Sequence, residues 1–384
     1  MFKSNIKINP IIHIISLNVP YPPNYGGIID IFYKIKALHE VGAKIHLHCF
    51  DYGRGMQMEL NKYCQSVSYY KRNRNIYKQF SSKPFIVSSR SSKKLLTNLL
   101  KDNYPILFEG LHTTFFIDHS SLADRIKVVR THNVEHLYYK LLQKQEPFFL
   151  RRWFFAAESR KLEKYQSILS HAQLIAAISP NDTKYFISKF DNTFWLPPFH
   201  SNSEIKTEVG SGNYALYHGN LSVRENIEAV LFLIDTFKET QINLIVTGKN
   251  PSIQIRKNIA KVKNIKLIAN PSYQEMMELI LNAHIHLLPT FQATGIKLKL
   301  IESLFMGRHC IVNFEMLSGT GLEKLCHLAN SKEEFLNKAL KLMSSPFENK
   351  DLIMRKEILS KKFSNNRNAQ MLLNAIKDSY LQIK

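Results

Sequence analysis

The chain has 384 residues, which is too long for one ordinary hydrophobic core and suits two domains. Hydrophobic residues make up 45% and charged residues 22%, a balance that is typical of folded proteins and excludes a disordered chain. The formal net charge of +21 is unevenly spread, +14 over residues 1–200 and +7 over residues 201–384, so an anionic partner is expected to meet the first half.

Cysteine usage and hydropathy predict a cytoplasmic protein. The four cysteines have no C-x-x-C spacing and are interpreted as buried thiols in a reducing compartment. The start of the chain, residues 1–10, lacks the long apolar region of a secretory signal. No run approaches the ~18 apolar residues that a membrane-spanning helix needs.

The first half begins with the pattern of a β-α-β unit. Ile11 to Leu17 is expected to be a buried strand, followed by a loop at 18–27, a helix from Ile28 to Val41 and a strand from Lys44 to Phe50. This order predicts a right-handed crossover in a parallel sheet.

Two adjacent glycines, Gly26 and Gly27, stand at the entrance of that helix. Without a Cβ they permit a ligand to approach the backbone closely. They do not complete a G-x-G-x-x-G fingerprint, and a structural tight turn explains them equally well.

Two further strands, Pro105 to Phe108 and Ile126 to Arg130, each end in polar residues. Ligands of open α/β sheets lie beyond the carboxyl ends of the strands. Glu109 and His132, which follow these strands, are therefore candidates for ligand contact, with a satisfied structural histidine as the alternative.

Residues 61–101 contain ten basic residues and no acidic residue, with aromatic residues between them. This composition suits an anionic bilayer or a nucleic-acid backbone, and a solvated loop is the alternative. A second cluster, residues 148–155, joins Arg151 and Arg152 to several aromatic residues at the start of a helical segment that runs to about Ser170. It indicates an interfacial helix, with packing into the domain left open.

The second half repeats the strand and helix alternation. A polar linker, Ser201 to Gly212, is followed by a second predicted doubly wound sheet that starts with the strand Tyr214 to His218. Arg224 follows a glycine turn at Gly219 and begins a helix, which is a suitable position for binding phosphate. The tail from Glu333 onward predicts three helices.

A junction at residues 284–306 has the strongest pattern for ligand binding. A strand (His284 to Leu288) leads through a turn into a helix whose start carries Lys297 and Lys299, where free N–H groups and positive charge favour an anion such as a diphosphate. Glu302, in the helix, can accept hydrogen bonds from two adjacent sugar hydroxyls. A surface glutamate and two solvated lysines are the alternative.

Several motifs occur in the order found in retaining glycosyltransferases of family 4, and together they cover nearly the whole chain. They are Gly26-Gly27, residues 130–139 (RTHNVEHLYY), 177–180 (AISP), 218–221 (HGNL), 224–226 (REN), 294–302 (TGIKLKLIE) and 306–307 (MG). The chain thus resembles the GT-B glycosyltransferases. The resemblance implies an α/β fold of two Rossmann-like doubly wound domains facing an interdomain cleft.

The resemblance also implies a division of labour between the domains. Residues 1–200 would form the acceptor-side domain and residues 201–365 the nucleotide-sugar domain, with a last helix at about 366–384 packing back on the first. By the same resemblance Glu302 would bind the ribose, and Arg224 with Lys297 or Lys299 would neutralise the diphosphate.

Further roles follow from the same resemblance. His132 would contact the donor sugar and the reacting region, so the implied catalytic residues are His132, Arg224 and Lys299. The remaining donor-binding residues would be Gly26, Gly27, Glu109, Gly219, Asn220, Gly295, Ile296, Lys297 and Glu302. Two positions depart from the family pattern: Thr294 stands where a glutamate is usual, and Asn220 stands where an arginine is common.

The predicted activity is transfer of a sugar from a nucleotide-sugar donor to a glycan or lipid-linked acceptor of polysaccharide synthesis, with retention. No D-x-D pair occurs in the sequence, so neither a metal nor another cofactor is expected. The expected location is the inner face of the plasma membrane, as a peripheral protein. The alternatives are a GT-B sugar-nucleotide epimerase, a non-catalytic scaffold suggested by Thr294, and a nucleic-acid-binding protein suggested by the charge, although no recognition helix, RNP strand or zinc spacing is present.

Overall fold

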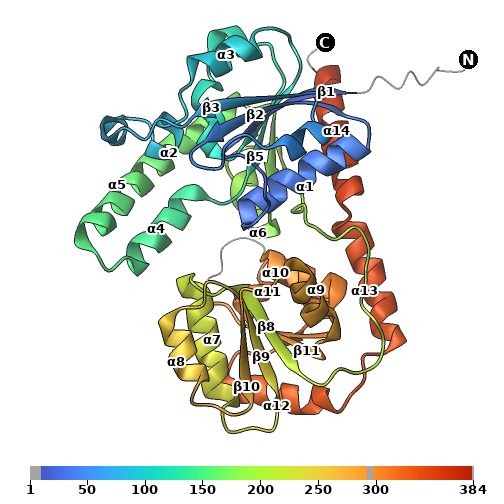
Figure 1. Ribbon diagram of the computed structural model, residues 1–384. Coiled ribbons are helices and arrows are strands. Elements are labelled where there is room, and N and C mark those ends of the chain that lie inside the picture. The colour runs from blue at the N-terminus through green and yellow to red at the C-terminus, as the bar shows by residue number, and fades with distance from the viewer. Residues whose placement is uncertain (1–9, 292–296, 383–384) are drawn as a thin grey trace, which may run out of the picture. The chain divides into compact units, whose positions relative to one another are not determined.

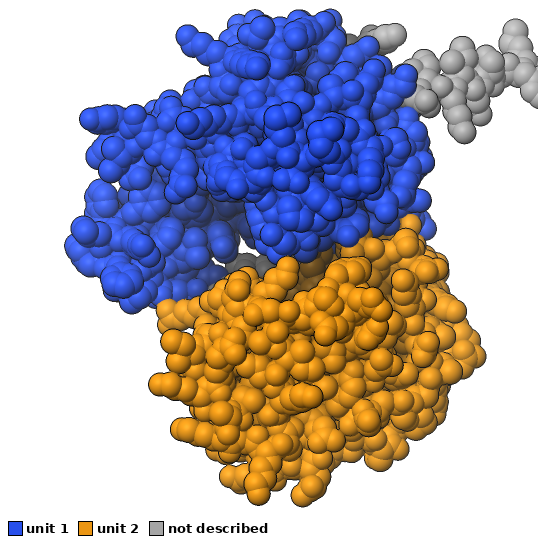
Figure 2. Space-filling model, viewed as in Figure 1, with its two compact units in different colours: residues 1–199, 365–384 blue, residues 200–364 orange. Residues whose placement is uncertain are grey.

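A computed structural model describes residues 10–291 and 297–382 of the chain. The chain divides into two compact units, residues 1–199 with 365–384 and residues 200–364, which Figure 2 shows in separate colours. Each unit is a parallel β-sheet with helices on its faces (Figure 1), so the predicted α/β fold of two Rossmann-like domains is confirmed.

The sheet of the first unit has seven parallel strands in the order β3-β2-β1-β4-β5-β6-β7. Its central strands are buried along almost their whole length, as expected of a sheet covered on both faces. The strands are β1 (Ile11–Ser16), β2 (Lys44–Asp51), β3 (Ser66–Lys71), β4 (Ile106–Glu109), β5 (Lys127–Thr131), β6 (Leu174–Ala177) and β7 (Thr193–Trp195).

The helices of this unit cover both faces of the sheet (Figure 1). The C-terminal helix packs against α1, and its Ala369, Leu372 and Ile376 join the hydrophobic core that α1 shares with the strands. The helices are α1 (Gly26–Glu40), α2 (Phe85–Ser88), α3 (Lys93–Leu99), α4 (Glu135–Gln145), α5 (Phe149–Tyr165), α6 (Pro180–Ile187) and α14 (Asn365–Gln382).

The second unit has a six-stranded parallel sheet in the order β10-β9-β8-β11-β12-β13. Its strands are β8 (Ala215–Asn220), β9 (Leu244–Lys249), β10 (Ile265–Ala269), β11 (Ile285–Leu288), β12 (His309–Val312) and β13 (His327–Leu328). Its helices are α7 (Arg224–Phe237), α8 (Ile253–Ile259), α9 (Tyr273–Asn282), α10 (Leu298–Met306), α11 (Phe314–Leu317), α12 (Lys332–Met343) and α13 (Asn349–Lys362).

The structure corrects two sequence interpretations. The first helix begins at Gly26, two residues earlier than expected, because the first N–H groups of a helix need no partner within it and glycine is tolerated there. The basic stretch at 61–101 is not a loop, since it contains β3, α2 and α3. Its strand β3 lies at the edge of the sheet and carries mostly polar residues, so it lacks the apolar pattern that predicts a buried strand.

None of the helices in the described residues is both long enough and apolar enough to span a membrane.

Candidate active site

Two polar clusters lie at the carboxyl ends of the parallel strands, one in each unit. In the second unit β8 and β11 are neighbours, with Ile285 paired to Ala215. The segments that leave these strands therefore meet at one edge of the sheet, where α7 and α10 begin. Gly295 and Ile296, together with Thr294, lie outside the described residues.

Lys299 points back to β8 and α7. Its ammonium group donates hydrogen bonds to the Tyr217 hydroxyl (3.2 Å) and to Oδ1 of Asn226 (2.9 Å), and it lies 4.9 Å from the centre of the Tyr217 ring. Asn226 in turn donates to the backbone carbonyl of Asn220, so Lys299 is connected to the turn after Gly219. Burial lowers the pKa of Lys299 to about 8.

Lys297, the residue before α10, forms an ion pair with Glu225 at 2.9 Å. The hydroxyl of Thr290 donates to the same carboxylate. Burial opposes ionisation of Glu225, but the Lys297 ammonium outweighs it and the pKa of Glu225 is lowered. Among the described residues no carboxylate lies within ion-pair distance of Lys299. The charge of Lys297 is compensated by Glu225, whereas the charge of Lys299 remains available to a ligand.

Glu302 lies on α10 with 27% of its side chain exposed. Burial raises the pKa of its carboxyl to about 7, so it is about half ionised at neutral pH. The nearest ring nitrogen, Nδ1 of His218, is 3.7 Å away. Burial and then the charge of Lys299 lower the pKa of His218 to about 3, so this histidine is neutral and leaves the carboxyl oxygens available to a hydroxyl donor.

The remaining two residues expected in this unit have different surroundings. Gly219 packs against Asn226, since a Cβ at this position would lie 3.3 Å from Nδ2 of Asn226. Arg224 is exposed at the first position of α7, next to Glu225. Five of the expected residues thus gather with Lys299 at one sheet edge: Gly219, Asn220, Arg224, Lys297 and Glu302.

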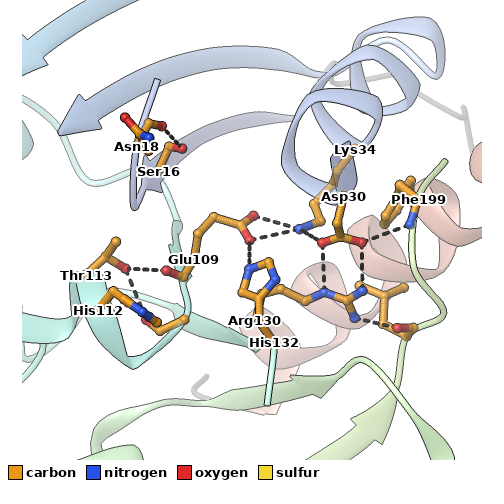
Figure 3. Close-up of polar contacts among 12 residues, drawn as sticks. Ser16, Asn18, Asp30, Lys34, Glu109, His112, Thr113, Arg130, His132 and Phe199 are labelled. Carbon is orange, nitrogen blue, oxygen red and sulfur yellow. Dashed lines mark hydrogen bonds and ion pairs between the residues drawn. The ribbon is translucent and has the colours of Figure 1, made fainter. Parts of the chain in front are cut away.

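In the first unit, a buried network of charges adjoins His132 (Figure 3). Lys34 of α1 donates to Asp30 (2.9 Å) and to Glu109 (2.7 Å), and Arg130 pairs with Asp30 at 3.0 Å. The strand register places Glu109 beside Arg130. Two carboxylates and two cations balance, which is the condition under which buried charges are tolerated.

His132 is held by this network. Its Nε2 lies 3.0 Å from Oε2 of Glu109, and its Nδ1 is buried and has no hydrogen-bond partner among the described residues. A Cβ on Gly27 would lie 3.9 Å from that nitrogen, so the glycine leaves the space above Nδ1 open. Glu109 therefore lies on the Nε2 side of His132, and both Glu109 oxygens accept hydrogen bonds. Gly27 lies on the opposite, Nδ1 side. Gly26 has no atoms near the position of a Cβ.

Asp30, Glu109 and His132 come close enough together to hold a metal ion. The donor set does not suit one, because the ammonium of Lys34 lies between the two carboxylates and the Arg130 guanidinium bonds to Asp30. A divalent cation would have to displace the Lys34 ammonium and the Arg130 guanidinium or lie next to them, where like charges repel.

Sequence reasoning did not identify Asp30, Lys34 or Glu225 as part of the clusters. The first two were detectable, because they form an i, i+4 acid–base pair on the apolar face of α1, next to Ile31 and Ile35. Glu225 carries no comparable signal, since its partner lies 72 residues away along the chain.

Comparison with known proteins gives a family for the second unit. Residues 212–345 match the model of the family described as glycosyl transferases group 1, and this range contains every candidate residue of the second cluster. A relative in Klebsiella pneumoniae, described as an uncharacterized 44.6 kDa protein in the cps region, is 26% identical over 315 residues, which are 76% of this chain and 79% of that protein.

Solved glycosyltransferase structures share the fold of the whole chain. The glycosyltransferase of Rickettsia africae ESF-5 has a TM-score of 0.66 at 12% identity, over 97% of this chain and 99% of that one. The HepE protein of Anabaena in complex with UDP-glucose has a TM-score of 0.64 at 12% identity, over 96% of this chain and 99% of that one.

Proposed function

We propose that this chain, a glycosyltransferase with the GT-B fold, transfers a sugar from a nucleotide-sugar to a glycan or lipid-linked acceptor, with retention and without a metal. The observation that carries the proposal is the grouping of Lys299, Lys297, Arg224 and Glu302 at one edge of the second sheet, inside the matched glycosyl transferases group 1 range. Retention rests on the resemblance to family 4.

The donor would bind to the second unit. Glu302 would accept hydrogen bonds from the two ribose hydroxyls, a task that favours its ionised form. Lys299 and Arg224 would face the diphosphate, and the charge that grows on the leaving oxygen would be stabilised by cations already in place. Gly219, Asn220, Gly295 and Ile296 would supply backbone groups near the phosphates. The complex of HepE with UDP-glucose supports a nucleotide-sugar as the class of ligand.

The first unit would supply His132. Its unpartnered Nδ1 would meet a hydroxyl of the donor sugar in the space left by Gly27, while Glu109 fixes the ring through Nε2. Gly26 would allow the backbone to approach the same ligand. The charge network beneath Glu109 would keep this geometry rigid.

The acceptor would be a precursor of a surface polysaccharide, reached at the inner face of the membrane. Support comes from the Klebsiella relative, whose description places it in a cps region. It also comes from residues 148–153, where the hairpin of α4 and α5 turns (Figure 1), which carry four exposed large apolar side chains and two arginines. The apolar ones are Phe148, Phe149, Leu150 and Trp153, exposed by 65%, 77%, 79% and 67%.

Exposed cations of the same unit would add electrostatic attraction. Six of the ten basic residues of the 61–101 stretch are exposed, namely Lys62, Lys71, Arg74, Lys93, Lys94 and Lys101. At about 1 kcal/mol for each cation close to an anionic surface, a few acting together would hold the protein peripherally at low salt.

The test of the function has two parts. First, UDP-, GDP- and ADP-sugars are screened for an increase in melting temperature, since a ligand at 100 times its dissociation constant adds about 2.7 kcal/mol. Second, release of nucleoside diphosphate from the stabilising donor is followed with and without a membrane extract as the source of acceptor. Release that depends on the extract supports transfer. Interconversion of the sugar without release would identify an epimerase, and no stabilisation by any donor would identify a non-catalytic protein.

A further inference from the structure

A cationic cavity lies in the first unit, at the edge of the sheet that also carries His132. It has a volume of about 610 Å³ and is formed where β2 and β3 end, with Tyr52, Lys71, Arg72 and Arg74 in its lining. The acidic residue in that lining, Asp51, accepts the backbone N–H groups of three following residues through one oxygen, and among the described residues it forms no ion pair with an arginine. The cavity is large enough for a small organic ligand.

Two arginines face the ring of Tyr52. The guanidinium carbon of Arg72 is 4.8 Å from the ring centre and that of Arg90 is 5.9 Å away. Arg90 is only 2% exposed and donates to the backbone carbonyls of Leu17 and Ile86. Within the described part of the chain, no carboxylate lies within ion-pair distance of either arginine. A buried cation without a counter-ion is costly, and a bound anion removes that cost.

Two further buried polar side chains, His112 and Glu135, follow β4 and β5 at the same edge of the sheet. Nδ1 of His112 and Oε1 of Glu135 lie 3.9 Å apart, and neither has a hydrogen-bond partner among the described residues. Burial raises the pKa of Glu135 to about 8, and burial followed by the charge of Arg90 holds the pKa of His112 well below its usual value. Both groups are therefore neutral at pH 7, so Glu135, only 3% exposed, is a hydrogen-bond donor and not a counter-ion for Arg90.

We propose that Arg72, Arg90, His112 and Glu135 bind a phosphoryl group of the acceptor substrate, with the rest of the acceptor in the adjoining cavity. Two guanidinium groups and a protonated carboxyl together offer more donors than a neutral sugar hydroxyl can accept, whereas a phosphoryl group presents several acceptor oxygens. The cluster lies at the carboxyl ends of β2, β3, β4 and β5, which is the edge that also carries His132. The inference rests on the proposed function in taking the first unit as the acceptor side.

The test measures binding of geranyl phosphate by isothermal titration calorimetry, with geraniol as the uncharged control. The wild type is expected to bind geranyl phosphate, and inorganic phosphate is expected to compete. Arg72→Gln is expected to weaken binding about tenfold or more, the value of one lost charge-assisted hydrogen bond. Arg74→Gln, at an exposed side chain that can be changed without disturbing the core, is expected to weaken it about threefold. The control Lys94→Gln removes the same charge from an exposed position of the same unit and is expected to have no effect.

Equal affinities of the Arg72, Arg74 and Lys94 variants for geranyl phosphate would overturn the proposal, as would equal binding of geraniol. Sedimentation with phosphatidylglycerol vesicles separates the acceptor site from a membrane contact. If Arg72→Gln lost vesicle binding but retained geranyl phosphate, the cluster would be a lipid-headgroup site and the proposal would be wrong. Binding of UDP-, GDP- and ADP-sugars is measured in parallel. If no variant and not even the wild type bound any of them, the result would count against the proposed donor and not against this site.

Discussion

Donor binding is expected to depend on pH with a maximum near pH 7.5, because two groups of the second unit titrate on either side of it. The carboxyl of Glu302, whose pKa burial raises to about 7, would accept the ribose hydroxyls best when ionised. The ammonium of Lys299, whose pKa burial lowers to about 8, would attract the diphosphate only while protonated. The diphosphate of a nucleotide-sugar is esterified at both ends and does not itself titrate in this range.

The size of this pH dependence follows from the pKa values of Glu302 and Lys299. If the competent form has Glu302 ionised and Lys299 protonated, the apparent affinity falls about sixfold from pH 7.5 to pH 6 and about sixfold from pH 7.5 to pH 9. Each fall corresponds to about 1.1 kcal/mol. Glu302→Gln is expected to lose the acidic limb and keep the alkaline one, whereas Lys299→Gln is expected to do the reverse.

The measurement is a series of calorimetric titrations from pH 5.5 to pH 9.5 with the donor that stabilises the protein most. Glu302→Gln should also bind more weakly than the wild type at pH 7.5, since an amide replaces one of the two acceptors. An acidic limb that persists in Glu302→Gln would show that another group titrates, and the assignment of Glu302 to the ribose would be abandoned.

Four further outcomes are expected. In the ligand-free protein the raised pKa of Glu302 means that its contribution to stability is complete below about pH 4.5 and is lost as the pH rises through about 7. Glu302→Gln should therefore increase the free energy of unfolding at pH 8.5 by up to about 3 kcal/mol, seen as a higher melting temperature, and should not increase it at pH 4. An equal effect at both pH values would contradict this. Arg224→Ala should lower kcat by at least about tenfold while leaving the melting temperature nearly unchanged, because its side chain is exposed and acts on charge in the transition state; wild-type turnover would place the diphosphate elsewhere. Glu109→Gln should destabilise the protein by about 3–5 kcal/mol in denaturant titrations, since it leaves Lys34 buried with one carboxylate fewer; a loss of activity at full stability would instead make Glu109 a purely catalytic group. Trp153→Ala should reduce sedimentation with anionic vesicles at low salt, and high salt should release the wild type; equal binding to neutral and anionic vesicles would remove the electrostatic argument.

Much of the fold could be predicted because its signals are local. Buried strands such as Ile11–Ser16 and Ile285–Leu288 consist mostly of aliphatic residues, and the helices between them repeat apolar residues with a helical period. The alternation of the two fixes a parallel sheet, and the direction of parallel strands fixes which loops carry ligands. The positions of His132, Lys299 and Glu302 at strand ends or helix starts were predictable for this reason.

The edge strand Ser66–Lys71 was missed for the converse reason. A strand that is only partly buried needs no apolar run, so its sequence resembles that of a basic loop. The burial of Arg90 was not predicted either. Nothing in a run of basic residues distinguishes Arg90, which is buried and donates to the backbone carbonyl of Leu17, from the basic residues that stay in solvent.

The sequence by itself determined the two α/β units, the order of their elements and the residue types at each strand end, since these depend on spacing over a few turns of chain. Only the tertiary structure decided which of those side chains retain a free charge. Among the residues that the structure describes, Lys297 is paired with Glu225 while Lys299 has no carboxylate partner, and Glu109 is paired with Lys34 while Nδ1 of His132 has no hydrogen-bond partner. Each of these pairs joins residues that are distant in the chain. Their charge and pKa are set by burial and by the neighbours that folding brings within a few ångströms, which no local pattern records.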